Sequence, residues 1–296
     1  MSWHDISPAT RTALVTAGLD PEQVTTLVGR ALDEDLDGGV DVTTAATVPD
    51  DQTAVLDLVA RQRGVVAGVP VAAAVFETVG GDDLTTTIGS VDGTRVGPGD
   101  VVVSAAGRTR DLLLAERTAL NLLCHLSGIA TQTDRWVQAL AGTAASVRDT
   151  RKTTPGMRRL EKYAVRCGGG VNHRMSLSDA ALVKDNHVLA AGGVVPAFDA
   201  VRRDFPGLPI EVEVDSIDQL EEVLVAGADL VLLDNFTTDQ MRQAVAINAG
   251  RAQLEASGGL TLDIAADVGA TGVDYLAVGA LTHSAPVLDI GADLRS

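Results

Sequence analysis

Residues 149–174, DTRKTTPGMRRLEKYAVRCGGGVNHR, concentrate positive charge in a chain whose formal net charge is −17. The stretch holds seven Arg and Lys residues and one His against two acids, and the three lysines of the chain, Lys152, Lys162 and Lys184, lie in it or soon after it. Arg binds carboxylates and phosphates through paired donors, and Lys supplies a compact charge that can also donate a proton. The stretch therefore indicates a ligand with several negative charges.

Five residues form the cationic set that we expect to bind this ligand: Arg151, Lys152, His173, Arg174 and Lys184. Lys184 is embedded in the apolar segment ALVKD. A buried Lys without a partner or a role is costly, so we expect Lys184 to be functional.

The helix-like segment GMRRLEKYAVR carries the other charges of the stretch. Arg159, Lys162 and Arg166 alternate with apolar residues there. We interpret these three as a solvated basic face of a helix, with no part in ligand binding.

An acidic set follows, made of Glu211, Glu213, Asp215 and Asp234. In IEVEVD the strand period of two sends the first three acids to one face and the intervening valines to the other. Carboxylates that face a cationic site can hold Mg²⁺, accept sugar hydroxyls or pair with lysines. A purely structural network of ion pairs is the alternative.

Two small-residue segments, ASGGLT and AVGALTHSA, stand at consecutive strand ends before predicted helices. Backbone N–H groups at helix N-termini bind phosphate, and Gly lets the ligand approach closely. Phosphate sites after late strands are frequent in β/α barrels. The sequence contains no GxGxxG fingerprint, Walker loop, HExxH motif or zinc-type CxxC pair.

The residues beyond 145 alternate short apolar strands with helical segments. Six strands are predicted: SVRDT, ALVKD, IEVEV, LVLLD, QLEAS and YLAVG. Repeated β/α units form a parallel sheet, and six of them favour a barrel, possibly incomplete, over an open doubly wound sheet. The polar residues described above stand at the strand ends, so we expect them to meet at the carboxyl-end mouth, where such folds perform catalysis.

The first part of the chain is predicted to begin with two short helices, each capped and opened by a proline: Ser7 before Pro8 and Asp20 before Pro21. Two β-rich segments follow, and the second has the turns of a structural hairpin; it resembles a lipoyl-type turn but lacks a Lys to modify. Residues 111–141 have helical spacing, with Gly128 as a break or a point of close packing. We place a domain boundary in the first turns of this helix, between residues 116 and 117.

Composition excludes several classes of protein. A pI near 4.5 argues against a nucleic-acid binder, because such proteins usually present a broad basic surface. No segment reaches the roughly 18 uninterrupted apolar residues of a membrane span, and the N-terminus lacks the pattern of a signal peptide. Two cysteines, Cys124 and Cys167, are too few for a disulfide framework, so we expect a cytoplasmic protein.

The motifs resemble those of a known family, quinolinate phosphoribosyltransferase, also called nicotinate-nucleotide pyrophosphorylase (carboxylating). The resemblance rests on ERTALNLLCHLSGIAT, DTRKTTPGMRRLEKYAVRCGGGVNHR, LVKDNH, IEVEVDS, LLDNF and EASGGL. It runs in unbroken order over nearly the whole chain, and DTRKTTPGMR together with GGGVNHR is highly specific.

The resemblance implies an α/β protein with an N-terminal α/β sandwich over residues 1–116 and an incomplete β/α barrel over 117–296. It implies decarboxylating phosphoribosyl transfer: quinolinate and phosphoribosyl pyrophosphate give nicotinate mononucleotide, pyrophosphate and CO₂, a step of NAD biosynthesis. It also implies Mg²⁺ and a homodimer, possibly a higher oligomer, whose active sites borrow residues from the neighbouring subunit.

The resemblance also assigns residues to parts of this reaction. Arg151, His173 and Arg174 would contact the quinolinate carboxylates, while Lys152 and Lys184 would act near quinolinate and pyrophosphate. Glu213 and Asp234 would face the ribose hydroxyls or the metal. The remaining substrate-binding positions are Thr150, the phosphate cradle of Ser257, Gly258, Gly259, Gly279 and Ala280, and Arg117, which would reach into the neighbouring subunit. Lys152, Lys184, Glu213 and Asp234 are the expected catalytic residues.

Two other functions fit parts of the pattern. A relative on the same scaffold, including the homologues associated with molybdenum transport, would use another base or carboxylate, and a preference for nicotinate over quinolinate would reveal it. A non-catalytic sensor of phosphorylated anions would need the cations and the phosphate loops but not the inward acids. Replacing Glu213 or Asp234 by Ala would leave such a sensor intact.

Overall fold

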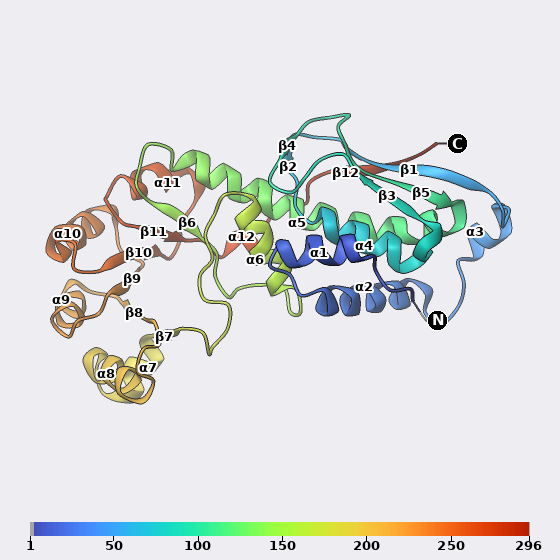
Figure 1. Cartoon of the computed structure of the whole chain (residues 1–296). Coiled ribbons are helices and arrows are strands. Elements are labelled where there is room, and N and C mark those ends of the chain that lie inside the picture. Colours follow the sequence, from blue (N-terminus) through green and yellow to red (C-terminus); the bar gives the residue numbers. More distant parts are fainter. Residues whose placement is uncertain (1–2, 296) are drawn as a thin grey trace. The chain divides into compact units, whose positions relative to one another are not determined.

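The structure is a computed structural model that describes residues 3–295, and Figure 1 shows its course. It divides into two compact units. The N-terminal unit comprises the residues up to 132, residues 159–169 and the residues from 285 onward; the C-terminal unit comprises residues 133–158 and 170–284. Helix α5 (Thr109–Ala139) contributes residues to both units. The boundary predicted between residues 116 and 117 lies inside this helix and stays a prediction.

The N-terminal unit contains a four-stranded antiparallel sheet in the order β12-β1-β5-β3 and a two-stranded sheet of β2 and β4. The strands are β1 (Thr53–Ala60), β2 (Gly64–Val65), β3 (Thr85–Ile88), β4 (Arg95–Val96), β5 (Val101–Arg108) and β12 (Ile290–Arg295). The helices are α1 (Pro8–Thr16), α2 (Pro21–Leu36), α3 (Val42–Thr47), α4 (Val69–Gly80), a 3-10 turn (Gly81–Asp83), most of α5, and α6 (Arg158–Cys167).

The two predicted helix starts are confirmed. The hydroxyl of Ser7 accepts a hydrogen bond from the backbone N–H of Thr10, and a carboxylate oxygen of Asp20 accepts one from the N–H of Glu22. Each contact satisfies a donor that the first turn of a helix leaves without a partner. Helices α1 and α2 therefore begin where the sequence indicates.

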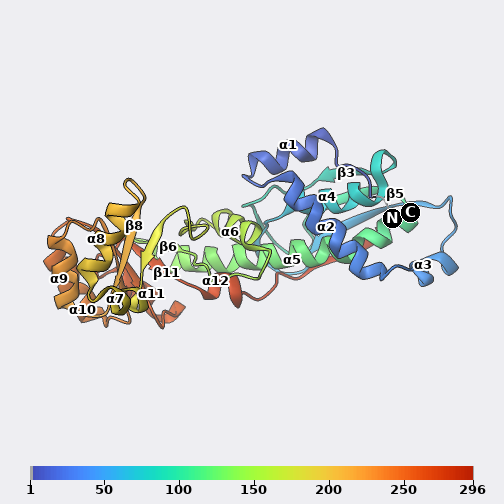
Figure 2. The same ribbon diagram turned by 90° about the horizontal axis from the view of Figure 1, so that it is seen from below.

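Helix α4 forms the centre of the N-terminal unit. Its sequence VPVAAAVFETVG is buried along nearly its whole length because it packs against β3 and β5 on one side and against α1 and α2 on the other. Figures 1 and 2 show α1 and α2 lying beside α4, on the same side of the sheet. Small Ala residues in this helix allow that close approach.

Gly128 marks a point of close packing within α5, which continues through it without a break. A Cβ atom at this position would lie 2.2 Å from the carbonyl oxygen of Pro286. Only Gly avoids that clash, so this part of the prediction is confirmed.

The interpretation of Lys162 as a solvated charge is wrong. Arg159 and Arg166 are exposed as expected, but Lys162 is fully buried in α6, and so is its neighbour Glu161. Glu161 lies 2.9 Å from His125 Nε2 of α5. Charges on a short helix are solvated only where no other element covers them, and here α6 is covered on more than its apolar side.

The C-terminal unit contains the six predicted strands as one parallel sheet. They are β6 (Ser146–Arg148), β7 (Ala181–Val183), β8 (Ile210–Val214), β9 (Leu230–Asp234), β10 (Gln253–Ser257) and β11 (Tyr275–Ala277). The helices are α7 (Asp185–Ala191), α8 (Val194–Asp204), α9 (Ile217–Val225), α10 (Thr238–Asn248), α11 (Leu262–Gly269) and α12 (Ala280–His283). Figures 1 and 2 show α8, α9, α10 and α11 around the outside of the strands.

The sheet has the strand order of a barrel with one seam left open. Each strand from β7 to β11 pairs with the next in sequence, and β11 pairs with β6, which gives the order β6-β11-β10-β9-β8-β7. Between residues 3 and 295, no ladder joins β6 to β7. The predicted incomplete barrel is confirmed, and the carboxyl ends of its six strands share one edge.

Among residues 3–295, no helix is both long enough and apolar enough to cross a membrane.

Candidate active site

A pocket of about 640 Å³ lies at the carboxyl ends of the barrel strands. Ten of the residues predicted from the sequence line it: Thr150, Arg151, Lys152, His173, Arg174, Lys184, Glu213, Asp234, Ser257 and Gly258. They come from segments more than 100 residues apart, and the parallel sheet brings them together. The convergence expected from the strand ends is therefore present.

Arg151 and Arg174 supply two cations to the pocket wall. The Nε atom of each is buried and has no hydrogen-bond partner among residues 3–295. Burial lowers the pKa of Arg174, and the positive charge of Arg151 lowers it further. Two partly buried like charges with free donors are favourable only when an anion binds between or beside them.

Asp149 organises the loop that presents this cationic wall. Its fully buried carboxylate accepts a hydrogen bond from the backbone N–H of His173 at 2.9 Å and another from the side-chain amide of Asn172. The Arg174 guanidinium donates to the carbonyl of Ala180 at 3.0 Å, just before β7. These contacts fix residues 172–174 (Asn-His-Arg) against both β6 and β7, the two strands that flank the open seam.

Lys184 and Glu213 form an ion pair across the mouth of the pocket. The distance from Lys184 Nζ to Glu213 Oε2 is 3.2 Å. Lys184 stands just past the end of β7, and its side chain is 47% exposed, whereas that of Glu213 is 14% exposed. The expectation that Lys184 is embedded in the strand is wrong, because the strand ends one residue earlier and the Lys leads into α7.

Asp234, Asn235 and Gly258 build a tight corner between β9 and β10. Asn235 adopts a left-handed backbone conformation with φ 57°, and its amide donates to the Asp234 carboxylate at 2.8 Å. A Cβ atom at Gly258, which has φ +89°, would lie 2.1 Å from Asn235 Oδ1. The corner therefore requires Gly at position 258.

Lys152 is held by the last β/α unit. Its carbonyl accepts a hydrogen bond from the hydroxyl of Thr282 at 2.7 Å, and its N–H donates to Thr150 Oγ1 at 3.0 Å. A Cβ atom at Gly279 would lie 2.9 Å from Lys152 Cδ. Gly279 thus leaves room for the Lys152 side chain, although it does not itself line the pocket.

Four of the predicted substrate-binding residues do not line this pocket: Arg117, Gly259, Gly279 and Ala280. Gly259 follows Gly258 in the same loop, and Ala280 is the first residue of α12. Arg117 belongs to the N-terminal unit, where its side chain is 63% exposed and lies 3.7 Å from Glu116. The roles of these four residues stay predictions.

Sequence reasoning missed six lining residues: Leu182, Asp185, Leu232, Asn235, Glu255 and Ala277. Asp185, Asn235 and Ala277 stand at a strand end or within two residues after it, so the same pattern that selected their neighbours could have found them. Leu182, Leu232 and Glu255 lie in the middle of β7, β9 and β10, and Glu255 differs from the two leucines in its charge. A single acid in the apolar strand QLEAS was the available signal.

Glu255 belongs to a buried polar centre with Arg148, His173 and Glu211. Arg148 donates to Glu255 Oε2 at 2.6 Å, and His173 Nε2 lies 2.6 Å from Glu211 Oε2. Burial raises the pKa of Glu255 to about 8, with a further contribution from the neighbouring carboxylate of Glu211. The alternation predicted for IEVEV places Glu211 in this centre and Glu213 against Lys184.

The donor set at the mouth is compatible with a magnesium ion. Glu213 and Asp234 contribute carboxylate oxygens to the same pocket. Mg²⁺ prefers oxygen ligands and is typically bound through one or two protein carboxylates together with ligand phosphates and water. These two acids therefore fit the ion that the sequence resemblance implies.

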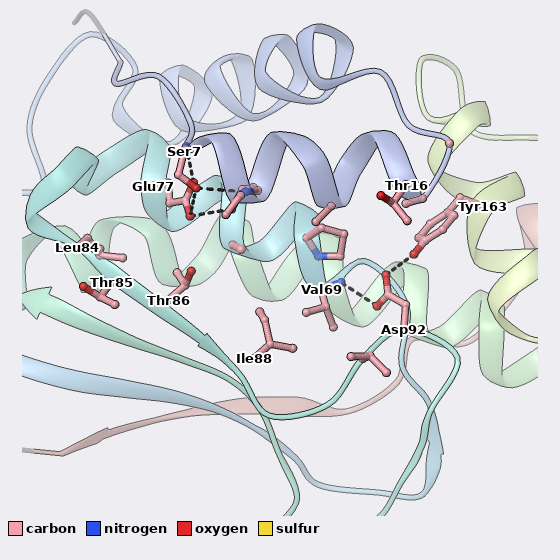
Figure 3. Close-up of a pocket in the computed structure, with 18 of the residues that line it drawn as sticks. Ser7, Thr16, Val69, Glu77, Leu84, Thr85, Thr86, Ile88, Asp92 and Tyr163 are labelled. Carbon is pink, nitrogen blue, oxygen red and sulfur yellow. Dashed lines mark hydrogen bonds between the residues drawn. The ribbon is translucent and has the colours of Figure 1, made fainter.

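A larger cavity, of about 1010 Å³, lies in the N-terminal unit. Figure 3 shows that its main polar groups bind one another: Glu77 accepts hydrogen bonds from Ser7 and Thr10, and Asp92 accepts them from Tyr163 and the backbone of Val69. Burial raises the pKa of Asp92. The larger cavity lacks a convergent set of free charges, so the smaller one is the better candidate.

Comparison with known proteins identifies both units. The family model described as "Quinolinate phosphoribosyl transferase, C-terminal domain" matches residues 129–293, and the model for the N-terminal domain matches residues 41–127. The chain is 54% identical over 271 residues to the nicotinate-nucleotide pyrophosphorylase [carboxylating] of Mycobacterium leprae, covering 90% of this chain and 95% of the relative. It is 38% identical to the probable enzyme of that name from Bacillus subtilis, covering 85% and 87%.

Solved structures agree with these matches. NadC from Streptococcus pyogenes aligns with a TM-score of 0.88 at 40% sequence identity, covering 94% of this chain and 99% of that chain. The nicotinate-nucleotide pyrophosphorylase from Francisella tularensis aligns with a TM-score of 0.89 at 35% identity, covering 93% and 96%. The architecture of both units is thus shared with these proteins.

Proposed function

The chain belongs to the quinolinate phosphoribosyltransferase family, and its activity is decarboxylating phosphoribosyl transfer to quinolinate; we propose that the pocket at the barrel mouth is the site of this reaction. The products of this pentosyltransferase are nicotinate mononucleotide, pyrophosphate and CO₂, and the reaction belongs to NAD biosynthesis. The pocket must then bind a small aromatic dicarboxylate and a phosphorylated sugar together.

One observation carries this assignment: Arg151 and Arg174 each keep a buried Nε without a partner on the wall of the same pocket. Quinolinate bears two adjacent carboxylates, and guanidinium groups bind carboxylates through paired donors. A dicarboxylate satisfies both donors and removes the repulsion between the two cations. A monocarboxylate would leave one of them without a partner.

The opposite side of the pocket suits phosphoribosyl pyrophosphate. Glu213 and Asp234 present carboxylates that can accept ribose hydroxyls, and the corner at Ser257 and Gly258 presents backbone close to the ligand. Lys152 lies in the same pocket and can offset negative charge on the pyrophosphate. The two substrates would therefore meet between the cationic wall and the acidic wall.

The reaction requires positioning and charge stabilisation at each stage. The pyridine nitrogen attacks the anomeric carbon as pyrophosphate leaves, and positive charge develops on the ribosyl ring, where Glu213 and Asp234 stabilise it. The pyridinium that forms accepts the electron pair when the adjacent carboxylate leaves as CO₂. A proton from Lys or water then replaces the carboxylate on the ring. Holding two polyanions in line supplies much of the rate enhancement.

Glu213 and Asp234 are also the residues that would hold Mg²⁺. The bound ion would neutralise charge on the pyrophosphate oxygens. The Lys184 ammonium lies 3.2 Å from Glu213 and so keeps this carboxylate oriented toward the pocket. We propose this role for Lys184 in addition to binding quinolinate.

The proposal includes a cytoplasmic homodimer, or a higher oligomer built from it, whose sites are shared between subunits. Two observations support it. The Arg117 side chain is 63% exposed and lies 3.7 Å from Glu116, so it is exposed enough to reach a neighbouring chain. Both cysteines are free thiols, as a reducing compartment would leave them.

An assay of both substrates tests the proposed function. Purified protein with Mg²⁺, quinolinate and phosphoribosyl pyrophosphate should release CO₂ and form nicotinate mononucleotide in equal amounts. Nicotinate offered in place of quinolinate should be a poor substrate. The absence of turnover when both substrates are shown to bind, or a preference for nicotinate, would contradict the proposal.

A further inference from the structure

The imidazole of His173 is held from both sides by groups of the protein. Its Nδ1 atom accepts a hydrogen bond from the backbone N–H of Arg174 at 2.7 Å. Its Nε2 atom lies 2.6 Å from Glu211 Oε2 and 3.6 Å from Glu255 Oε1. Because Nδ1 is an acceptor here, the ring proton of this tautomer is on Nε2, where it faces the two carboxylates.

The side chains of Glu211 and Glu255 are almost completely enclosed, and the Arg174 guanidinium is a further charge that acts on Glu211. Glu211 is 3% exposed and Glu255 is 0% exposed, and both oxygens of Glu211 and Oε1 of Glu255 lack an aligned hydrogen-bond partner. Arg148 neutralises only the far oxygen of Glu255 and stacks over the ring of Tyr275 at 4.4 Å. The Nε2–H dipole of His173 is thus the group that the remaining buried oxygens attract.

A metal ion in place of that proton fits less well, although these three side chains form a His-Glu-Glu group whose ligand atoms all lie within 4.8 Å of one another. Two ligands at about 2.1 Å from a tetrahedral zinc ion are separated by roughly 3.4 Å. The 2.6 Å between His173 Nε2 and Glu211 Oε2 is shorter than that. Arg148 also places a positive charge beside the group, which disfavours a divalent cation.

We propose that Glu211 and Glu255, the latter anchored by Arg148, are positioning residues that keep His173 in its Nε2–H tautomer and thereby fix the backbone of Arg174. Each of the four residues comes from a different segment: β8, β10, β6 and the loop before β7. In this tautomer Nδ1 can accept the hydrogen bond from the Arg174 N–H. That hydrogen bond fixes the backbone of Arg174, one of the two arginines on the pocket wall. The inference rests on the proposed function for its kinetic consequences but not for its spectroscopic ones.

Nitrogen-15 NMR of the histidine rings tests the tautomer in the whole protein without substrate. The chain has five histidines, and the variant His173→Gln assigns the signals of interest. In the unmodified protein His173 should show a protonated Nε2 and an unprotonated Nδ1. Glu211→Leu should lose this preference, whereas Glu211→Gln, whose amide oxygen keeps an acceptor beside Nε2, should restore it.

A matched control uses a second His–Glu contact. Glu161 is 0% exposed and lies 2.9 Å from His125 Nε2 in the N-terminal unit. The variant Glu161→Gln changes a contact of the same kind away from the barrel pocket. It should leave both the His173 signals and the kinetic constants unchanged, which separates positioning from general loss of stability.

The kinetic readout separates the two substrates. Glu211→Leu and Glu255→Leu should raise the KM for quinolinate about tenfold, the size of effect that follows when one polar contact that positions a charged group is lost, and change the KM for phosphoribosyl pyrophosphate by less than about twofold. If either variant does not fold, Glu255→Gln serves in its place with a smaller effect in the same direction.

Three results would overturn the proposal. The first is an unaltered His173 tautomer in Glu211→Leu. The second is an equal change in both KM values. The third is loss of the Nε2 proton on addition of one equivalent of Zn²⁺ alone, which would identify the group as a metal site. A protein that shows no turnover at all would instead contradict the proposed function, and the NMR result would still decide the role of Glu211.

Discussion

The ammonium of Lys184 lies 3.2 Å from the carboxylate of Glu213, and the two residues stand at the ends of adjacent parallel strands. Because Lys184 is 47% exposed, this pair should contribute at most about 1 kcal/mol to stability. We expect the pair to matter for activity, because it places the two charges at the pocket mouth.

Lys184→Ala and Glu213→Gln should therefore separate stability from activity. The free energy of unfolding should change by less than about 1 kcal/mol. Turnover should fall about 100-fold or more, because charge stabilisation in the transition state is lost. Steady-state kinetics and urea unfolding measure the two effects. Asp204→Asn, which breaks the exposed pair with Arg203, is the control and should change neither. Unchanged turnover in both pocket variants would remove these residues from the mechanism.

Gly258→Ala should affect binding of phosphoribosyl pyrophosphate specifically. The new Cβ would lie 2.1 Å from Asn235 Oδ1, so the corner that we propose as part of the phosphate cradle must shift. Gly207 has a similar φ of +84° but nothing within 4 Å of its Cβ position, which makes Gly207→Ala a matched control for backbone strain. Gly207→Ala should lose about 1 kcal/mol of stability from backbone strain alone, and Gly258→Ala should lose more because the overlap adds to the same strain. Only Gly258→Ala should raise the KM for phosphoribosyl pyrophosphate, and equal kinetics in the two variants would contradict the assignment.

Glu255 should make stability fall as pH rises. Its pKa is raised from 4.5 to about 8 in the folded chain, mainly by burial. Between these values the folded chain holds a proton that the unfolded chain has released, so the free energy of unfolding decreases with pH. Glu255→Gln cannot lose that proton. The difference in unfolding free energy, unmodified protein minus variant, should decline by up to about 1.4 kcal/mol per pH unit between about pH 4.5 and about pH 8. Urea titrations across this range would refute the argument if they gave a constant difference.

A mixture of two inactive variants tests the shared site. Arg117→Ala and Lys184→Ala subunits should each form inactive dimers. A mixed dimer combines the intact Lys184 of one chain with the intact Arg117 of the other, so an equal mixture should recover about a quarter of full activity. Exchange of differently tagged subunits provides the control. No recovery after proven exchange would contradict a site built from two chains.

Much of the barrel could be predicted because each strand has a recognisable pattern in its own local sequence. Segments such as IEVEV and LVLLD have the length and apolar pattern of strands in a parallel sheet, and each ends in a polar residue. Parallel strands bring those ends to one edge whatever their order. The convergence of residues such as Arg151, Glu213 and Asp234 could therefore be predicted from the sequence alone.

The features that were missed depend on contacts between distant segments. Glu255 lies at the centre of β10, between β9 and β11, and its partner Arg148 is 107 residues away. Lys162 has the local pattern of an exposed helix charge, and only the packing of α6 within the N-terminal unit buries it. Lys184 is exposed because β7 ends one residue before it. The ends of strands are the least predictable part of an element.

The central claim is that quinolinate binds between the free guanidinium donors of Arg151 and Arg174 at the barrel mouth. A crystal structure of the protein with quinolinate bound tests it most directly. We predict that the two carboxylates of quinolinate will each accept hydrogen bonds from one of these guanidinium groups, within the pocket that Lys184 and Glu213 also line. Quinolinate in the larger cavity of the N-terminal unit, or in the barrel pocket with neither Arg151 nor Arg174 in contact, would contradict it.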